Sequence, residues 1–140
     1  MRKDYPYRRL GAAVVCLLVA GCGRSNAPTD VPSAKAALTT ALEGWKAGQS
    51  PDSLRQGSPS IVMVDEAWQK GEKLDSFENI GPEVDDGVNL HCTVKLAIKG
   101  EGGVQRSEKV TYIVGTSPMI TIFRDPSPIT LIPRDGVPKP

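Results

Sequence analysis

A run of alternating side chains from Val88 to Ile98 constrains the fold more than any other feature of this chain. Apolar residues occupy every second position of the run, and Asn89, His91, Thr93 and Lys95 lie between them. Because successive side chains of a strand point to opposite faces, the run predicts a strand with one buried and one solvated face. A sheet built on such a strand needs another layer to cover its apolar face.

The segments around this strand predict its partners. Lys99–Gly103 is rich in glycine and predicts a hairpin loop. Further strands are expected at 61–64, 73–80, 104–114 and 119–123, with a turn at 81–87 and Val110, Tyr112 and Val114 on one face of the returning strand. Because the later strands follow one another through short turns, we expect an antiparallel meander.

A helix is the natural cover for this sheet. In residues 33–47 the apolar side chains recur at helical spacing and form one stripe, Ser33 is suited to cap the start, and Gly48 follows the end. The prediction is an α+β domain over residues 33–125, with one N-terminal amphipathic helix packed on a four- to five-stranded antiparallel sheet. In element order this layout resembles the cystatin-like and NTF2-like group of folds.

Two short stretches between the helix and the meander have caps of their own. Ser50 followed by Pro51 predicts one turn of helix. Asp65 is placed to cap a second turn over residues 66–70, which Gly71 would close.

The first residues have the features of an export signal. Arg2, Lys3, Arg8 and Arg9 precede an uncharged, mostly apolar stretch at 10–20, which is shorter than the roughly 20 residues that span a bilayer. The stretch ends in Leu18-Val19-Ala20-Gly21-Cys22, which resembles the lipobox of bacterial lipoproteins. The resemblance implies cleavage between Gly21 and Cys22, a thioether-linked diacylglycerol on Cys22, and acylation of the new terminus by a fatty acid such as palmitate.

This resemblance gives the chain a place in the cell. Residues 1–21 would be the signal peptide and 22–32 a flexible tether, and acylated Cys22 would hold the protein to membrane lipid on the periplasmic or outer side of the cell envelope. Gly23 is not the aspartate associated with inner-membrane retention, so the outer membrane is favoured where a cell has two. Residues 126–140 contain five prolines and are expected to form a tail outside the sheet.

Charge and cysteine content argue against a nucleic-acid partner and against an intramolecular disulfide. Removal of residues 1–21 takes away four basic residues and one acidic residue, which leaves 13 basic and 15 acidic residues and a net charge of −2. A nucleic-acid-binding domain normally has a clear basic excess, so no nucleic acid is expected. With Cys16 removed and Cys22 acylated, Cys92 has no partner for an intramolecular disulfide.

The residues that could carry chemistry do not form a recognisable catalytic set. His91 and Cys92 are adjacent on a strand and therefore point to opposite faces, so they are not expected to form a nucleophile–base pair. Glu83, Asp85 and Asp86 could touch a calcium ion, but a solvated turn is the favoured interpretation because the EF-hand spacing is absent. No catalytic residue, metal or cofactor is predicted.

Two functions remain open. The favoured one is a non-enzymatic binding or accessory module on the membrane, with a protein partner that the sequence does not identify. The alternative is an NTF2-like small-molecule-binding protein or enzyme with a pocket between helix and sheet. Trp45, Trp68 and Tyr112 are its possible lining residues, and Asp65 or His91 would supply a polar contact. With Phe77 these aromatic residues serve equally well as the core, and the core is the favoured interpretation because few other large side chains can fill the interior.

Overall fold

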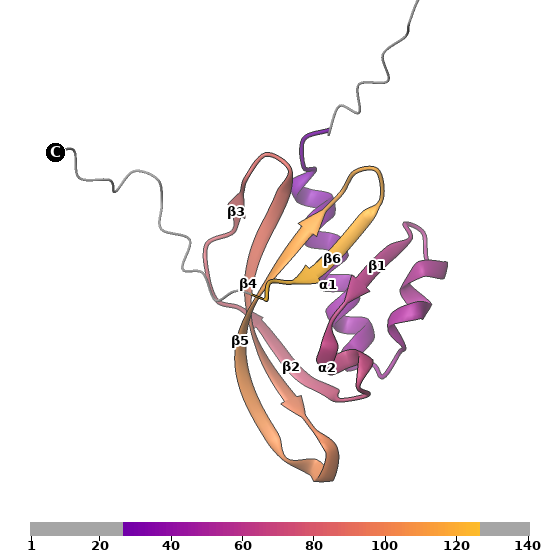
Figure 1. The fold of residues 1–140 in the computed structure, drawn as a ribbon, viewed down its shortest axis with the longest axis vertical. Helices are drawn as coiled ribbons and strands as arrows, with labels where there is room; N and C mark the ends of the chain where they lie inside the picture. Colours follow the sequence, from indigo (N-terminus) through magenta and orange to yellow (C-terminus); the bar gives the residue numbers. More distant parts are fainter. Residues whose placement is uncertain (1–26, 127–140) are drawn as a thin grey trace, which may run out of the picture.

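The computed structural model describes residues 27–126 (Figure 1). The predicted signal peptide, the cleavage site at Gly21 and Cys22, the start of the tether and almost all of the Pro-rich tail lie outside these residues. The helical segments are α1 (Val31–Lys46), the 3₁₀ helix η1 (Pro51–Gln56), α2 (Glu66–Gln69) and the 3₁₀ turn η2 (Glu101–Gly103). The strands are β1 (Ile61–Val64), β2 (Lys73–Asn79), β3 (Val84–Asp85), β4 (Asn89–Lys99), β5 (Gln105–Gly115) and β6 (Ile120–Arg124).

The strands form one mixed sheet of six strands in the order β1-β6-β5-β4-β2, with β3 paired to β4. The meander β4-β5-β6 is antiparallel as predicted, and β2 is antiparallel to β4. The prediction of a purely antiparallel sheet is wrong for β1, which pairs in parallel with β6. The prediction of four or five strands is also exceeded, because β3 lies within the segment expected to be only a turn.

The sheet curls around α1, which lies against its concave side (Figure 1). The alternation in β4 is confirmed from Leu90 onward, since the five side chains that follow this pattern (Leu90, Cys92, Val94, Leu96 and Ile98) are all buried. The helix contributes the matching stripe: Ala34, Ala37, Leu38, Ala41, Leu42 and Trp45 are buried on one side of it. The α+β architecture therefore follows from two apolar faces that cover each other.

The start of α1 differs from the prediction. The cap is Asp30, whose carboxylate accepts hydrogen bonds from the backbone N–H (3.2 Å) and the hydroxyl (2.9 Å) of Ser33. Ser33 was expected to be the cap but lies in the first turn. Pro32 does not prevent the earlier start, because the first N–H groups of a helix have no partner inside the helix. Gly48 follows the end of α1 with φ +79°, in the left-handed conformation expected of it.

The start of β4 also differs. Val88 was expected to point inward with Leu90, but it precedes the strand and is exposed. Gly87, with φ +88°, turns the chain just before it, so the alternation begins only at Asn89. The cap of α2 is confirmed, since Asp65 accepts hydrogen bonds from the N–H groups of Ala67 and Trp68 at 2.9 and 3.1 Å.

Candidate functional site

The convex face of the sheet carries a row of side chains that crosses five strands. Val64 of β1 pairs with Phe123 of β6, and Phe123 pairs with Ile113 of β5. Ile113 pairs with His91 of β4, which pairs in turn with Val84 of β3. Paired residues point to the same face with their Cβ atoms about 5 Å apart, so these five residues are lateral neighbours. We call them the outer row.

The outer row is unusually exposed for a mainly apolar surface. Val64, Phe123 and Val84 keep 39%, 44% and 41% of their surface accessible, and Ile113 is half-buried. At about 4.8 Å between strands, the row is about 19 Å long. Isolated exposed apolar residues are ordinary on a protein surface, but contiguous ones mark surfaces that contact other molecules.

His91 is the polar member of the outer row. Its Nε2 lies 2.9 Å from a carboxylate oxygen of Asp86, and its Nδ1 is buried without a hydrogen-bond partner among the described residues. Asp86 also accepts backbone hydrogen bonds from Val88 and Asn89 at 2.9 and 2.7 Å. The hydrogen bond from His91, followed by those from Asn89 and Val88, lowers the pKa of Asp86 to about 2. Asp86 is therefore ionised and fixes the imidazole at the sheet surface.

Behind the row, on the concave face, lies a buried carboxylate. Asp65 is only 1% exposed. One of its oxygens accepts the two N–H groups at the start of α2, and the other accepts the Tyr112 hydroxyl at 2.7 Å and the Arg124 Nε at 3.0 Å. Tyr112 and Arg124 are paired residues of β5 and β6, so both point at Asp65 from the same side. The arrangement ties α2, β5 and β6 together.

The hydrogen bonds around Asp65 occupy all of its acceptor positions. A carboxylate has about four lone-pair sites, and the four donors fill them. Burial, then the charge of Asp65 and its hydrogen bond, raise the pKa of Tyr112 well above the ordinary value of tyrosine. Burial alone would lower the pKa of Arg124, but hydrogen bonding to Glu108 and the charge of Asp65 raise it overall. The group therefore holds a neutral phenol and a charged guanidinium in fixed positions.

A line of ion pairs continues from this group toward solvent. Arg124 Nη2 donates to Glu108 at 3.0 Å, and Glu108 lies 3.6 Å from Arg106. Arg106 in turn donates to Glu72, which follows α2. Charges therefore alternate along the concave side of β5, and each has an oppositely charged neighbour.

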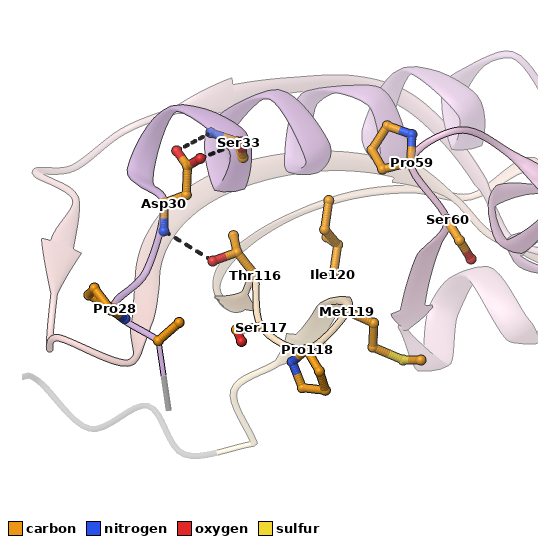
Figure 2. A pocket seen from close by; sticks show the side chains of 11 residues that line it. Pro28, Asp30, Ser33, Pro59, Ser60, Thr116, Ser117, Pro118, Met119 and Ile120 are labelled. Atoms are coloured by element: carbon orange, nitrogen blue, oxygen red, sulfur yellow. Dashed lines mark hydrogen bonds between the residues drawn. The ribbon is translucent and has the colours of Figure 1, made fainter. Parts of the chain in front are cut away.

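The pocket in Figure 2 lies at the end of the domain where residue 27 enters. It has a volume of about 590 Å³ and lies between the N-terminus of α1, the segment before β1 and the β5–β6 turn. Asp30, Thr116 and Met119 are among its lining residues, and the backbone N–H of Asp30 donates to the Thr116 hydroxyl at 3.0 Å. Asp30 is the one ionisable residue among those that line it.

The residues predicted as a possible pocket lining lie in the hydrophobic core. Trp45 and Trp68 stack with ring centroids 5.5 Å apart, and their indole N–H groups donate to the carbonyls of Glu72 and Gln49 at 2.7 and 2.9 Å. Tyr112 is fully buried and bonded to Asp65, and other residues line the pocket of Figure 2.

Cys92 and the acidic turn at 83–86 are the remaining candidates from the sequence. Cys92 is buried on the face opposite His91, and burial raises the pKa of its thiol to about 11. Among residues 27–126 there is no group of three or more His, Cys, Asp or Glu side chains placed to hold a metal ion, and Asp85 and Asp86 instead bond the backbone of their own turn. The helices of this part of the chain are too short or too polar to cross a bilayer.

Sequence reasoning missed the two strongest features of the site. The outer row depends on strand register, which no local pattern reveals. The bond of Asp65 to Tyr112 and Arg124 joins residues 47 and 59 positions apart. One signal was present: the alternation around Ile122 puts Arg124 on the buried face, where a charged side chain requires a partner.

Comparison of the chain with protein-family models, with curated proteins and with solved structures gave no significant match.

Proposed function

We propose that this protein is a lipid-anchored lipoprotein of the bacterial cell envelope whose domain is a non-enzymatic binding module for another protein. The anchor rests on the lipobox-like Leu18–Cys22 and on the basic and apolar segments before it. Cys22 would carry the acyl chains, and with Gly23 following it the outer membrane is the favoured location in a cell with two membranes.

The observation that carries the binding function is the outer row. Val64, Phe123 and Ile113 form the apolar part of the row, and Val84 is a further exposed apolar residue beyond His91. Exposed apolar groups of this kind typically lie at the core of protein interfaces. The partner that fits would present apolar side chains along an extended or helical segment about as long as the row. The row has one ionisable member, His91, so this contact would depend on apolar burial more than on charge.

The absence of enzymatic activity is part of the proposal. Asp65, the buried carboxylate of the described domain, has its acceptor positions filled by Tyr112, Arg124 and the start of α2. General acid–base catalysis needs a group within hydrogen-bond reach of a substrate proton, and this carboxylate is occupied by the protein itself.

Three measurements test the proposal. Wild-type protein should partition into the detergent phase and Cys22→Ala into the aqueous phase, and intact mass should show a diacylglyceryl group on the processed chain. Cross-linking in intact cells should capture the same partner with wild type and with Val104→Ser, and lose it with Phe123→Ser. Val104 is an exposed apolar residue just before β5, at the end of that strand away from Ile113, so it controls for a general loss of surface hydrophobicity. A monomer that captures no partner, or equal capture by Phe123→Ser, contradicts the binding function.

The alternative of an NTF2-like pocket between α1 and the sheet has less support. Its fold relationship to the cystatin-like and NTF2-like group is supported by a helix lying in a curled sheet. Against a ligand site there, Trp45 and Trp68 stack on each other and Asp65 has no free acceptor. Binding of an apolar dye that is lost in Trp45→Ala but retained in Phe123→Ser would favour this alternative.

A further inference from the structure

The end of the domain that holds the pocket of Figure 2, here called the pocket end, is where the chain enters the domain at residue 27. The turn before β4 and the β5–β6 turn lie at the same end. Ile61 pairs with Ile120 and Asn89 pairs with Gly115, so β1 and β6 start, β5 ends and β4 starts at one end of the sheet. The N-terminus of α1 lies at the same end, because Asp30 bonds to Thr116 (Figures 1 and 2).

The tether is short compared with the domain. From Cys22 to Ala27 there are five peptide steps, and at no more than about 3.6 Å per residue they span at most about 18 Å. Strand β5 alone contains 11 residues, which at about 3.3 Å per residue is about twice that length. A lipid on Cys22 therefore keeps the pocket end within about 18 Å of the bilayer, whereas the β4–β5 hairpin lies at the far end of β5.

The surface of this end exposes two large apolar side chains beside three aspartates. Met119, in the β5–β6 turn, is 56% exposed, and Val88 in the turn before β4 is exposed as well. Asp30 caps α1, and Asp85 and Asp86 accept hydrogen bonds from the backbone of their own turn. The pocket lining otherwise offers hydroxyls and apolar groups, which are compatible with the zwitterionic headgroup region.

We propose that the pocket end is a membrane-contact surface, with Met119 as the side chain that enters the lipid headgroup region and the pocket open toward the headgroups. This inference rests on the proposed acylation of Cys22. The bilayer is its ligand, and the contact gives the domain a fixed orientation, with the strands directed away from the membrane. The acyl chains supply the affinity, since a surface without basic residues in its pocket attracts lipid only weakly.

The test uses the acylated, processed protein in vesicles of phosphatidylcholine. Met119→Cys is labelled with an environment-sensitive fluorophore, and Val104→Cys at the β4–β5 hairpin is the matched control, since Val104 is 69% exposed. The two remaining thiol positions do not interfere, because Cys22 is consumed by the thioether and burial raises the pKa of Cys92 to about 11. Nitroxide-labelled lipid is then added as a quencher.

Interfacial groups lie about 5–10 Å into the headgroup region, so the label at position 119 should lose at least about half of its fluorescence while the label at 104 is unaffected. Insertion of about 20 Gly and Ser residues after Gly23 lengthens the tether several-fold and should reduce quenching at 119 toward the level at 104. Equal quenching at 119 and 104, or quenching at 119 that the longer tether leaves unchanged, overturns the inference.

The same samples separate the two proposals. Flotation with the vesicles and the mass of the intact chain report acylation independently of orientation. If the protein floats with the diacylglyceryl mass but position 119 is not quenched, the orientation is wrong and the lipoprotein assignment stands. If the chain neither floats nor carries lipid, both proposals fail.

Discussion

Replacement of Asp65 by asparagine tests whether this carboxylate holds the sheet to α2. Asparagine has nearly the same size, so the variant leaves no cavity and changes only charge and hydrogen bonding. Its amide group has one oxygen and one NH₂. Either the two N–H groups of α2 or the pair formed by Tyr112 and Arg124 then faces another donor.

The magnitude follows from these contacts. Removal of one member of a buried ion pair destabilises by about 3–5 kcal/mol, and the lower end applies because Arg124 is partly exposed and keeps Glu108. We therefore expect Asp65→Asn to lower the free energy of unfolding by about 3 kcal/mol. For a domain of this size that corresponds to a fall in Tm of about 10–25 °C. Most domains are stable by about 5–15 kcal/mol, so the variant should still fold.

Urea titration followed by tryptophan fluorescence measures the effect directly, because Trp45 and Trp68 are stacked in the core. The matched control is Glu66→Gln, which removes a neighbouring carboxylate that is exposed and whose ion-pair partner within residues 27–126 is Lys70. Exposed pairs of this kind contribute little to stability, so the control should be close to wild type.

A second variant checks the coupling. Tyr112→Phe removes only the hydroxyl that donates to Asp65, and in the Asp65→Asn background its effect should be clearly smaller than in wild type, because the two residues share one hydrogen bond. Loss of less than about 1 kcal/mol in Asp65→Asn, or additive effects of the two substitutions, would refute the reasoning that Asp65 joins these elements.

Three further predictions concern titration. The pKa of Tyr112 is raised by burial, so the folded, processed protein should show no tyrosinate absorbance at pH values where an unfolded tyrosine ionises. Because the fold favours the neutral phenol, Tyr112 should contribute its full stabilisation below pH about 10 and less above it. The pKa of Asp86 is lowered to about 2, so its carboxylate should stabilise the fold above pH about 4, and this stabilisation should disappear as the pH falls toward 2. Acid denaturation should therefore show Asp86→Asn less stable than wild type above pH about 4 and equally stable near pH 2. The difference should be no more than about 1 kcal/mol, because Asp86 is half-exposed. The pKa of Cys92 is raised to about 11 by burial, so a disulfide reagent at pH 8 should modify it in urea and leave it unmodified in the native protein; rapid native reaction would contradict its burial.

The elements with local signals were predictable from the sequence. Alternation identified β4, glycines identified the hairpin after it, and Asp65 was recognised as a cap because a carboxylate stood before a helical turn. The errors occurred where a second local choice competed. Ser33 and Asp30 are both good caps separated by Pro32, and the structure uses the one that lets proline sit in the first turn, where its missing N–H has no consequence.

The parallel pairing of β1 with β6 was not predictable by the same means. Strands that follow one another in the sequence tend to pair, but β1 and β6 are the first and last strands in chain order. Its place is explained by Asp65, which directly follows Val64 and bonds to Arg124, the residue that follows Phe123. The bond holds the ends of β1 and β6 together, which is compatible with their parallel direction.

The same register creates the outer row, and this connects the buried group to the proposed function. Val64 and Phe123 are adjacent on the convex face because Asp65 and Arg124 meet behind them on the concave one. In the sequence, Val64 and Phe123 are each a single apolar residue at a solvated position, and single exposed apolar residues are common on protein surfaces. An Asp65→Asn variant that retains its fold but loosens β1 should therefore weaken partner capture as well as stability. Glu66→Gln should change neither, although it lies one residue further along the same turn.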